Sequence, residues 1–434
     1  MNLKPSIEYA SKEEIKSFQE QKLRELLTYL KENSDFYQKL FAENQIDISA
    51  IKTLENLSKL PTTSKDDLQK NNLDFFCVPT DRIVDYSTTS GTLGDPVTFG
   101  LSDQDLERLA YNEAISFACA GIEKGDLVQM MTTIDKRFMA GMAYFLGLRK
   151  MGAGVIRMGP GIPELQWDSI LRYRPKWLIT VPSFLLKMIE YAENHGIDYQ
   201  NSSVYGAVCI GESLREQDFT DSELSKKIAE KWNIKLFSTY ASTEMSTAFT
   251  ECEFQKGGHH HPELIITEIL DDDQNPVKEG ESGELVITTL GVEAIPLLRF
   301  RTGDIVKPHY EPCECGRTTM RLGPVIGRKQ QMIKYKGTTL YPPVLSDLLR
   351  SYQGISCYQI IIRKDKVGMD EILVKVSCKD ESEKFIKEVK DHFRAKIRVS
   401  PEIEVCTHEE LFREVHHALR RKPINFIDLR DKNY

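Results

Sequence analysis

A loop of serine, threonine and glycine residues is the first segment whose residue types indicate chemistry. It reads YSTTSGTLGDP, from Tyr86 to Pro96. Glycine lets the backbone approach an anion closely, and hydroxyl groups and backbone amides supply hydrogen-bond donors. The loop is not a Walker loop, because no Gly-Lys-Ser/Thr sequence follows it. It predicts a phosphate-binding loop, and a polar surface turn is the alternative with about equal weight.

A second polar segment, TYASTEM, runs from Thr239 to Met245 at the end of an apolar stretch typical of a strand. In a parallel sheet, ligands bind outside the carboxyl ends of the strands. Glu244 could hold Mg²⁺ through a carboxylate oxygen, and Tyr240 could stack on a base. The alternative is a turn from a strand to a helix, in which Ser, Thr and Glu act as helix caps.

Three further segments carry charged residues in positions that could serve a nucleotide. In RFRTGDIV, Asp304 follows Gly303, and a carboxylate in such a turn could accept both hydroxyls of a ribose; the alternative is an ordinary hairpin turn. The segment GRKQQMIKYKG, from Gly327 to Gly337, crosses an expected domain break. Lys422 lies in RRKPINFIDLR, and the alternative there is a solvated run of charges.

Cysteine and histidine residues form a candidate metal site. Cys252 lies in ECEF, the run GGHHHPE contains His259, His260 and His261, and Cys313 and Cys315 lie in CECGR. Three thiolates and one imidazole make a tetrahedral zinc set, and four protein ligands leave no open position for catalysis. The alternative is free thiols beside an exposed histidine cluster.

The periodicity of apolar residues predicts the elements that position these segments. Between 127 and 240, short apolar runs alternate with amphipathic segments of helical length, which predicts an α/β fold with a parallel sheet wrapped on both faces. Residues 12–45 read as helices. Residues 263–310 read as antiparallel strands separated by Gly/Asp turns, and the last hundred residues as a small α+β unit.

Composition limits the classes of function. The 434 residues include 57 Lys+Arg and 65 Asp+Glu, a net charge of −8, which disfavours duplex nucleic acid and anionic membranes as partners. The N-terminus has no signal-peptide pattern, and no apolar run reaches the roughly 20 residues of a membrane span. Nine scattered cysteines, an odd number, favour a reducing cytoplasm.

In this order and spacing the motifs closely resemble the adenylate-forming superfamily of acyl-CoA synthetases and, within it, the phenylacetate–CoA ligase family. The resemblance runs from PTTSKDDL at 61–68, through IGE at 210–212, to DLR at 428–430. It implies a large N-terminal domain, residues 1–328, with parallel sheets flanked by helices and a β-barrel-like subdomain. A small mobile α+β lid domain, residues 329–434, follows.

The resemblance also implies roles for single residues. The loop residues expected to hold the β- and γ-phosphates of ATP are Ser87, Thr88, Thr89, Ser90, Gly91, Thr92 and Gly94. The residues expected around the rest of the nucleotide are Gly211 and Glu212 at the adenine pocket, Tyr240 stacked on adenine, Ala241 and Ser242 beside it, Asp304 on the ribose and Arg328 near the hinge. Thr243 should contact the α-phosphate, and Glu244 should carry Mg²⁺.

The implied reaction is an ATP-dependent ligation of a carboxylic acid to coenzyme A. An acyl-adenylate and pyrophosphate form first, and the thiol then displaces AMP. Lys422 should bridge the carboxylate and the α-phosphate, although the family usually has Gly where this chain has Arg421. The lid should rotate between the two steps and bring Gly337 near the thiol tunnel; Gln330 and Gln331 replace two acids usual at that hinge.

Several features stay open in the sequence. Matching the family's Gly-x-His segment selects His260 for a structural zinc, with His259 and His261 as rivals. Asp135, Lys136 and Arg137 replace mostly apolar residues, either to line a pocket for a polar acid or to lie on its rim. Phenylacetate is therefore only the family's default acid. The acceptor could differ from coenzyme A, the chain could be a catalytically silent nucleotide-binding relative, and it could form a homodimer.

Overall fold

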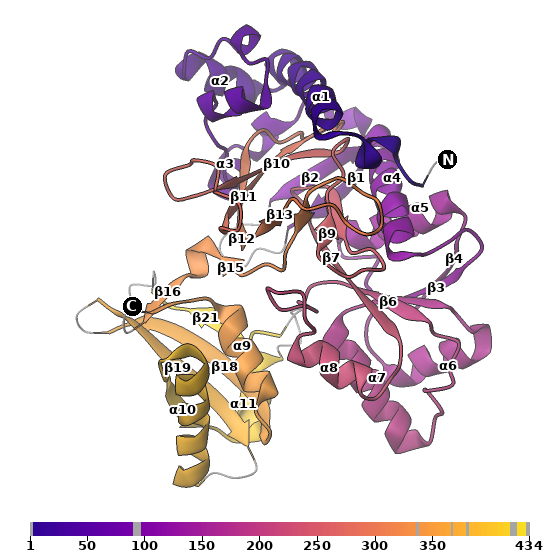
Figure 1. The fold of residues 1–434 in the computed structure, drawn as a ribbon, viewed down its shortest axis with the longest axis vertical. Helices are drawn as coiled ribbons and strands as arrows, with labels where there is room; N and C mark the ends of the chain where they lie inside the picture. Colours follow the sequence, from indigo (N-terminus) through magenta and orange to yellow (C-terminus); the bar gives the residue numbers. More distant parts are fainter. Residues whose placement is uncertain are drawn as a thin grey trace. The chain divides into compact units, whose positions relative to one another are not determined.

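The computed structural model describes residues 3–89, 97–335, 338–365, 368–378, 382–416 and 423–430 (Figure 1). The chain forms two compact units, Met1–Pro324 and Val325–Tyr434. The division lies between Pro324 and Val325, whereas the sequence analysis placed it between residues 328 and 329. Among the described residues, no helix combines the length and apolar character needed to cross a membrane.

A five-stranded parallel sheet lies at the centre of the first unit. Its strands are β3 (Leu127–Met130), β4 (Gly154–Arg157), β5 (Trp177–Thr180), β6 (Gly206–Cys209) and the first half of β7 (Lys235–Ser242), in the order β4-β3-β5-β6-β7. The connecting helices are α5 (Met139–Met151), α6 (Pro163–Tyr173), α7 (Pro182–His195) and α8 (Glu223–Ala229). The predicted alternation of strands and helices is confirmed.

Apolar side chains on alternate strand positions bury both faces of this sheet. Leu178 and Ala207 face a core formed with α6, α7 and α8 that includes Trp167, Leu185 and Ile228. Trp177, Ile179 and Val208 face a second core, formed with α5 and α4 (Asp103–Ala120). All four residues of β5 and of β6 are buried, as in strands covered by helices on both sides.

The sheet continues beyond β7 in antiparallel pairs. The added strands are β8 (Thr247–Thr250), β9 (Gly258–His259), β14 (Arg321–Leu322) and β13 (Pro308–His309). Residues 235–238 of β7 pair with β6, and residues 239–242 pair with β8. The segment after Ser242 is therefore a hairpin turn rather than a turn from a strand to a helix.

The first unit also contains a second sheet, three N-terminal helices and a strand pair. Strands β10 (Ile265–Leu270), β11 (Gly283–Thr289) and β12 (Phe300–Val306) form the expected antiparallel sheet. The N-terminal helices are α1 (Lys12–Asn33), α2 (Asp35–Glu43) and α3 (Lys65–Lys70), and β1 (Ile83–Thr88) pairs with β2 (Thr98–Ser102). Short 3₁₀ helices span Ser6–Tyr9, Ile48–Ala50, Leu54–Lys59, Asn72–Phe75 and Thr80–Arg82. The helical prediction for 12–45 is confirmed.

The second unit is a small α+β domain with its own core. Its main sheet has the order β20-β19-β18-β21, formed by β18 (Ile355–Lys364), β19 (Asp370–Cys378), β20 (Glu402–Val405) and β21 (Phe426–Asp428). Its helices are α9 (Pro342–Ser351), α10 (Glu383–Ile397) and α11 (His408–Val415). The unit also contains β15 (Gly327–Arg328), the 3₁₀ helix Lys329–Gln331, and the hairpin of β16 (Ile333–Tyr335) and β17 (Thr338–Leu340).

Candidate functional site

The carboxyl ends of β6 and β7 present most of the residues expected to bind a nucleotide. Gly211 and Glu212 follow β6, while Tyr240, Ala241 and Ser242 end β7 and Thr243 and Glu244 form the turn after it. Because β6 and β7 are parallel, these segments meet at one edge of the sheet. We call this group, together with Asp304, the nucleotide edge. Apart from Asp304, its side chains are partly or fully exposed, so a ligand can reach them.

Two of these residues, from distant parts of the chain, are in direct contact. The Tyr240 hydroxyl donates a hydrogen bond to the Asp304 carboxylate, with 2.7 Å between the oxygens. Tyr240 comes from β7, whereas Asp304 comes from β12 in the other sheet and is buried. The residues expected to contact adenine and ribose are thus brought together by the fold.

The side chain of Glu212 is held by a hydrogen bond to the first turn of a helix. Its carboxylate accepts a hydrogen bond of 2.8 Å from the backbone amide of Ser183, in the first turn of α7. A carboxylate at this position satisfies an amide that has no partner within the helix. The preceding Gly211 is exposed and has a φ of 78°, a left-handed conformation that favours glycine. The side chain of Glu212 is thereby anchored while the backbone at Gly211 remains accessible.

The turn that carries Thr243 and Glu244 is held by hydrogen bonds. Ser242 Oγ accepts from the Met245 amide at 3.3 Å, and Ser246 Oγ donates to the Thr243 carbonyl at 3.1 Å. Buried Arg108 of α4 fixes the end of the turn through a 2.6 Å hydrogen bond from Nη1 to the Ser246 carbonyl. Burial lowers the pKa of Arg108 to about 10. Sequence reasoning missed Arg108, because its partners are carbonyls far away in the chain.

Only the first part of the expected phosphate loop is described. Ser87 is buried at the end of β1, and the Thr89 amide donates to the Val97 carbonyl at 3.0 Å. The Thr88 amide donates to the Arg137 carbonyl at 3.1 Å, so the turn at 135–137 lies against the start of this loop. Several expected site residues lie outside the described residues: Ser90, Gly91, Thr92, Gly94, Gly337 and Lys422.

The charged turn Asp135–Arg137 follows β3 and is exposed at all three positions. Lys136 and Arg137 both adopt left-handed conformations, with φ of 59° and 57°. Thr133 donates a hydrogen bond to the Asp135 carboxylate, which lowers the pKa of that carboxyl. Of the two alternatives left open by the sequence, this exposure favours the rim of a pocket.

In the second unit, Arg328 is an exposed residue at the end of β15. Arg430 of the terminal DLR motif holds the segment after it. Its guanidinium donates to the Met332 carbonyl at 2.6 Å and to the Gln330 carbonyl at 3.2 Å, and it pairs with Asp370 at 3.1 Å. Arg430 therefore ties residues 330–332, which include the expected hinge glutamines, to the body of the second unit.

The expected metal ligands gather into one cluster, with a different histidine. The ligand atoms of Cys252, His259, Cys313 and Cys315 all lie within 4.8 Å of one another. The Cys252 and Cys313 sulfurs are 3.6 Å apart, and Cys315 Sγ is 3.5 Å from His259 Nε2. The hydrogen bond from Cys252 lowers the pKa of the Cys315 thiol, and the thiolate is the form that binds metal. We call these four residues the sulfur–imidazole cluster.

His260, selected by the sequence comparison with the family, lies elsewhere. Its Nε2 is 2.6 Å from the Ile265 carbonyl, and its ring stacks on Phe249 with centroids 6.0 Å apart. Consecutive side chains of an extended segment point to opposite sides, so His259 and His260 cannot both face the sulfurs. A set of three sulfurs and one imidazole, with three of the four residues buried, fits the donor preference of Zn²⁺.

A buried acid–base group borders the cluster. Arg317 donates to Cys315 Sγ at 3.5 Å and to the Glu8 carboxylate at 2.6 Å. Glu8 also contacts His261 Nδ1, and His261 Nε2 lies 3.1 Å from Ser116 Oγ. The Ser–His–Glu contacts resemble those of a hydrolase triad, but Ser116, His261 and Glu8 are each 0% exposed. No substrate can reach Ser116, so the group is structural.

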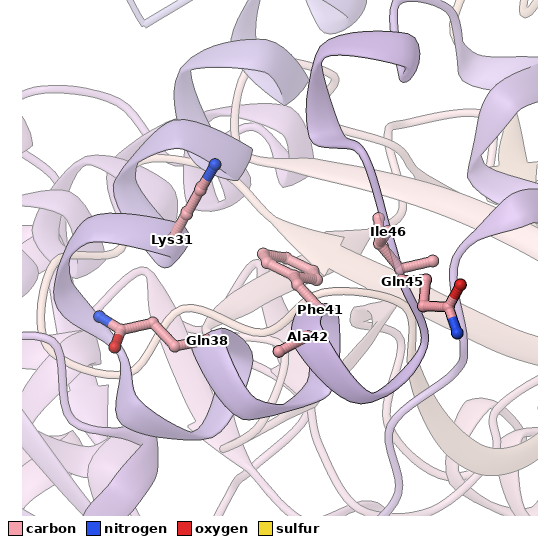
Figure 2. A pocket seen from close by; sticks show the side chains of 6 residues that line it. All are labelled: Lys31, Gln38, Phe41, Ala42, Gln45 and Ile46. Atoms are coloured by element: carbon pink, nitrogen blue, oxygen red, sulfur yellow. The ribbon is translucent and has the colours of Figure 1, made fainter.

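A separate surface hollow lies between α1 and α2 and is shown in Figure 2. It is lined by Lys31, Gln38, Phe41, Ala42, Gln45 and Ile46. It contains none of the residues expected to bind the nucleotide or a metal.

Comparisons with known proteins show the family to which the chain belongs. A family model described as AMP-binding enzyme matches residues 30–293, and one described as AMP-binding enzyme C-terminal domain matches residues 337–430. The phenylacetate-coenzyme A ligase of Thermus thermophilus is 31% identical, covering 90% of this chain and 86% of that protein. The phenylacetate-coenzyme A ligase of Escherichia coli is 29% identical, covering 87% of this chain and 85% of that protein.

A solved structure shares the fold. The crystal structure of 2-hydroxyisobutyryl-CoA ligase in the postadenylation state aligns with a TM-score of 0.80 at 23% identity. The alignment covers 94% of this chain and 88% of that chain. At this identity the likeness shows the fold alone.

Proposed function

The chain belongs to the AMP-binding enzyme family, with phenylacetate–CoA ligases among its relatives, and on this premise we propose that it joins a carboxylic acid to coenzyme A at the expense of ATP. The observation that carries the proposal is the contact between Tyr240 and Asp304. It joins an aromatic ring and a carboxylate, suited to a base and a ribose, at the carboxyl edge of a parallel sheet, where ligands of such sheets bind.

The first chemical step makes the acid reactive. A carboxylate oxygen attacks the α-phosphorus of ATP, the bond to the β-phosphate breaks, and pyrophosphate leaves. The product is an acyl-adenylate, whose leaving group, AMP, departs far more readily than an oxide ion from a free carboxylate. Tyr240 stacks on adenine, and Asp304 accepts the ribose hydroxyls in place of the Tyr240 hydroxyl. These contacts hold the α-phosphate in position for attack.

Charge that builds up at the α-phosphate has to be balanced by hydrogen-bond donors and cations. Thr243 donates its hydroxyl to a phosphate oxygen, and Lys422 places an ammonium group between that phosphate and the carboxylate. The Glu244 carboxylate, partly exposed in the turn, would hold Mg²⁺, which neutralises phosphate charge when bound. Ser87, Thr88 and Thr89 begin the loop that holds the β- and γ-phosphates.

In the second step the thiol of coenzyme A attacks the acyl carbonyl, the bond to AMP breaks, and a thioester forms. Phenylacetate is the first acid to test, because the relatives named above carry that name. Polar acids should be tested as well, because the exposed turn Asp135–Arg137 would place charged side chains at the rim of the acid pocket. We assign structural zinc to the sulfur–imidazole cluster, which leaves no ligand position for a substrate.

The test is pyrophosphate release from ATP and Mg²⁺ with a panel of aryl and aliphatic acids, with and without coenzyme A. We expect release that depends on one acid, with equal amounts of AMP and thioester when coenzyme A is present. Acid-dependent release without thioester would indicate another acceptor. A protein that binds ATP yet releases no pyrophosphate with any acid would contradict the proposal. Lys422→Ala should abolish release while leaving ATP binding intact, measured by calorimetry.

A further inference from the structure

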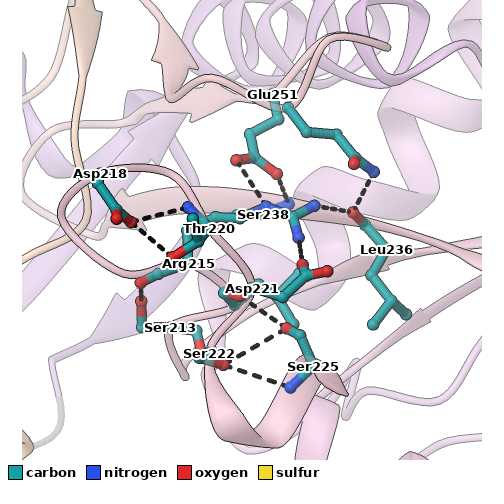
Figure 3. Close-up of polar contacts among 12 residues, drawn as sticks. Ser213, Arg215, Asp218, Thr220, Asp221, Ser222, Ser225, Leu236, Ser238 and Glu251 are labelled. Atoms are coloured by element: carbon teal, nitrogen blue, oxygen red, sulfur yellow. Dashed lines mark hydrogen bonds and ion pairs between the residues drawn. The ribbon is translucent and has the colours of Figure 1, made fainter. Parts of the chain in front are cut away.

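A buried ion pair joins the loop after β6 to the end of β8, next to the nucleotide edge (Figure 3). Arg215 Nε lies 3.4 Å from Glu251 Oε1, and the two side chains are 5% and 1% exposed. Arg215 lies in no motif of the sequence analysis, and Glu251 enters it only as the residue before Cys252 in ECEF; neither is assigned a role in the reaction above. Two charges so deeply buried are costly unless each has further polar partners.

Arg215 uses its other nitrogens to fasten the loop of residues 211–222. Nη2 donates to the Leu236 carbonyl of β7 at 2.8 Å, and Nη1 pairs with the Asp221 carboxylate (Figure 3). Residues 215 and 221 also form an isolated antiparallel bridge, so the guanidinium holds both arms of the loop. The same loop begins with Gly211 and Glu212 of the nucleotide edge. Arg215 therefore fixes this loop against β7.

Glu251 acts on β7 itself, at the point where the strand changes partners. Ser238 is the last residue of β7 to pair with β6, and Thr239 is the first to pair with β8. At this junction the Ser238 amide donates to the Glu251 carboxylate at 2.8 Å, while the Ser238 carbonyl accepts from the Glu251 amide at 2.9 Å. Tyr240 lies two residues further along β7. The carboxylate of Glu251 thus sets the course of the strand that presents Tyr240.

The next residue, Cys252, belongs to the sulfur–imidazole cluster. The Glu251 carboxylate contacts β7 at the Ser238 amide, and the adjacent Cys252 contributes its sulfur to the cluster. The cluster therefore holds the backbone at Cys252, and this fixes the position of the neighbouring Glu251, whose carboxylate accepts the hydrogen bond from Ser238.

Resting on the proposed function, we propose that Arg215 and Glu251 form one positioning unit for the adenine-binding part of the nucleotide edge. Arg215 positions Gly211 and Glu212, and Glu251 positions Tyr240. Neither residue needs to touch the nucleotide. The pair should set the affinity for ATP and AMP and leave the affinity for the acid unchanged.

The experiment compares Glu251→Gln, Arg215→Met and the double variant with the wild-type protein by calorimetric titration with AMP and ATP. Arg215→Met leaves the buried Glu251 carboxylate without its ion-pair partner, and Glu251→Gln leaves the buried guanidinium paired with Asp221 alone. We therefore expect the dissociation constants of both nucleotides to rise about tenfold. The double change removes both charges, and we expect its loss to be smaller than the sum of the single losses. In steady-state assays the KM for ATP should rise in parallel, and the KM for the acid should not.

A matched control is Asp126→Asn. Asp126 pairs with Lys176 at 2.9 Å. The two residues lie just before β3 and β5, at the amino ends of the strands and therefore opposite the carboxyl ends that form the nucleotide edge. This change should lower the unfolding temperature without altering the nucleotide dissociation constants. Conservative Arg215→Lys keeps the charge and should recover part of the ATP affinity, and zinc content measured by mass spectrometry should match the wild type in every variant.

Two results would overturn the inference: unchanged nucleotide affinity in both single variants, or an equal loss of affinity in Asp126→Asn. Either result would leave the proposed function standing, provided the wild-type protein binds ATP and releases pyrophosphate. Failure of the wild-type protein to bind ATP would contradict the proposed function itself. Should one single variant not fold, the other and the double variant decide.

Discussion

The nucleotide edge includes the end of β7, and the sulfur–imidazole cluster includes residues from β9 and just after β8, which pair in the same sheet. Their side chains are nevertheless used in opposite ways. Tyr240 and Glu244 are partly exposed, and Tyr240 meets the edge of another sheet through Asp304. The ligand atoms of the cluster lie within 4.8 Å of one another, and three of the four residues are buried. A site that transforms substrates must remain accessible, whereas a site that holds the fold together satisfies its polar atoms internally.

The largest effect should follow from breaking the cluster. Cys313→Ser removes one of the four proposed zinc ligands, and we expect the free energy of unfolding to fall by about 4 kcal/mol, because binding of a structural metal would contribute directly to folding. Chemical denaturation and metal content by mass spectrometry check this together. Cys406→Ser, in the second unit and outside the cluster, is the control. Retention of the metal in Cys313→Ser would show that Cys313 is no ligand.

Substitutions of the two adjacent histidines test which of them belongs to the sulfur–imidazole cluster. His259→Asn should release the metal, and His260→Asn should keep it, because His260 bonds to the Ile265 carbonyl instead. The opposite outcome would restore the assignment made from the sequence.

Substitution of a residue of the nucleotide edge should lower the enzymatic activity more than the stability of the protein. Asp304→Ala removes both expected ribose contacts, and we expect kcat/KM for ATP to fall about a hundredfold, since hydrogen bonds to a charged group contribute about 1.5–3 kcal/mol each. Stability should fall only modestly, by about 1 kcal/mol, because the change also removes the hydrogen bond that Tyr240 donates to the buried carboxylate. Exposed Asp273→Ala, in the turn between β10 and β11, is the control. A large loss of stability with unaltered kcat/KM would contradict a role for Asp304 at the site.

At low pH the protein should lose stability, because the Glu8 carboxylate beside the cluster becomes protonated. His261 and Arg317 lower the pKa of Glu8 below its ordinary value of 4.5, although burial of the carboxyl acts against them. Because the folded state has the lower pKa, the ionised carboxyl stabilises the fold above about pH 4.5, and this contribution is lost as the pH falls towards the folded value. Glu8→Gln should lower the free energy of unfolding by about 2 kcal/mol at pH 7 and flatten its acid dependence. An unchanged pH profile would contradict this.

The smallest effect concerns the exposed turn Asp135–Arg137. A left-handed conformation costs a residue other than glycine about 1–2 kcal/mol, and the greater entropy of glycine in the unfolded chain offsets about half of this. Lys136→Gly should therefore stabilise the protein by about 0.5 kcal/mol. Denaturant titration measures the change, and Lys150→Gly, within α5, should be destabilising instead.

Local patterns predicted the elements well, because alternating apolar runs and amphipathic helices determine where each strand and helix of the central sheet lies. They also placed Tyr240, Glu244 and Gly211 at strand ends, since a parallel sheet brings such ends together. The hairpin after Ser242 was not foreseen: TYASTEM permits either a cap or a tight turn, and pairing with β8 decides between them.

Contacts between residues distant in the chain could not be predicted from local sequence patterns. Arg108, Arg215, Glu251 and Arg430 hold carbonyls, amides or carboxylates that are mostly distant in the chain, and no spacing in the sequence reveals such partners. The cluster contains His259 rather than the expected His260, and the sequence could not select it for a similar reason. Which of two adjacent histidines faces the sulfurs depends on the register of β9 against β8 and β14.

The most direct test of the account follows one carboxylate oxygen. The acid identified by pyrophosphate release is labelled with ¹⁸O in its carboxyl group and converted with ATP and coenzyme A, and the products are analysed by mass spectrometry. Attack of the carboxylate on the α-phosphorus, followed by displacement of AMP by the thiol, predicts one ¹⁸O atom in AMP and none in pyrophosphate. Unlabelled AMP, or label in inorganic phosphate, would contradict an acyl-adenylate intermediate.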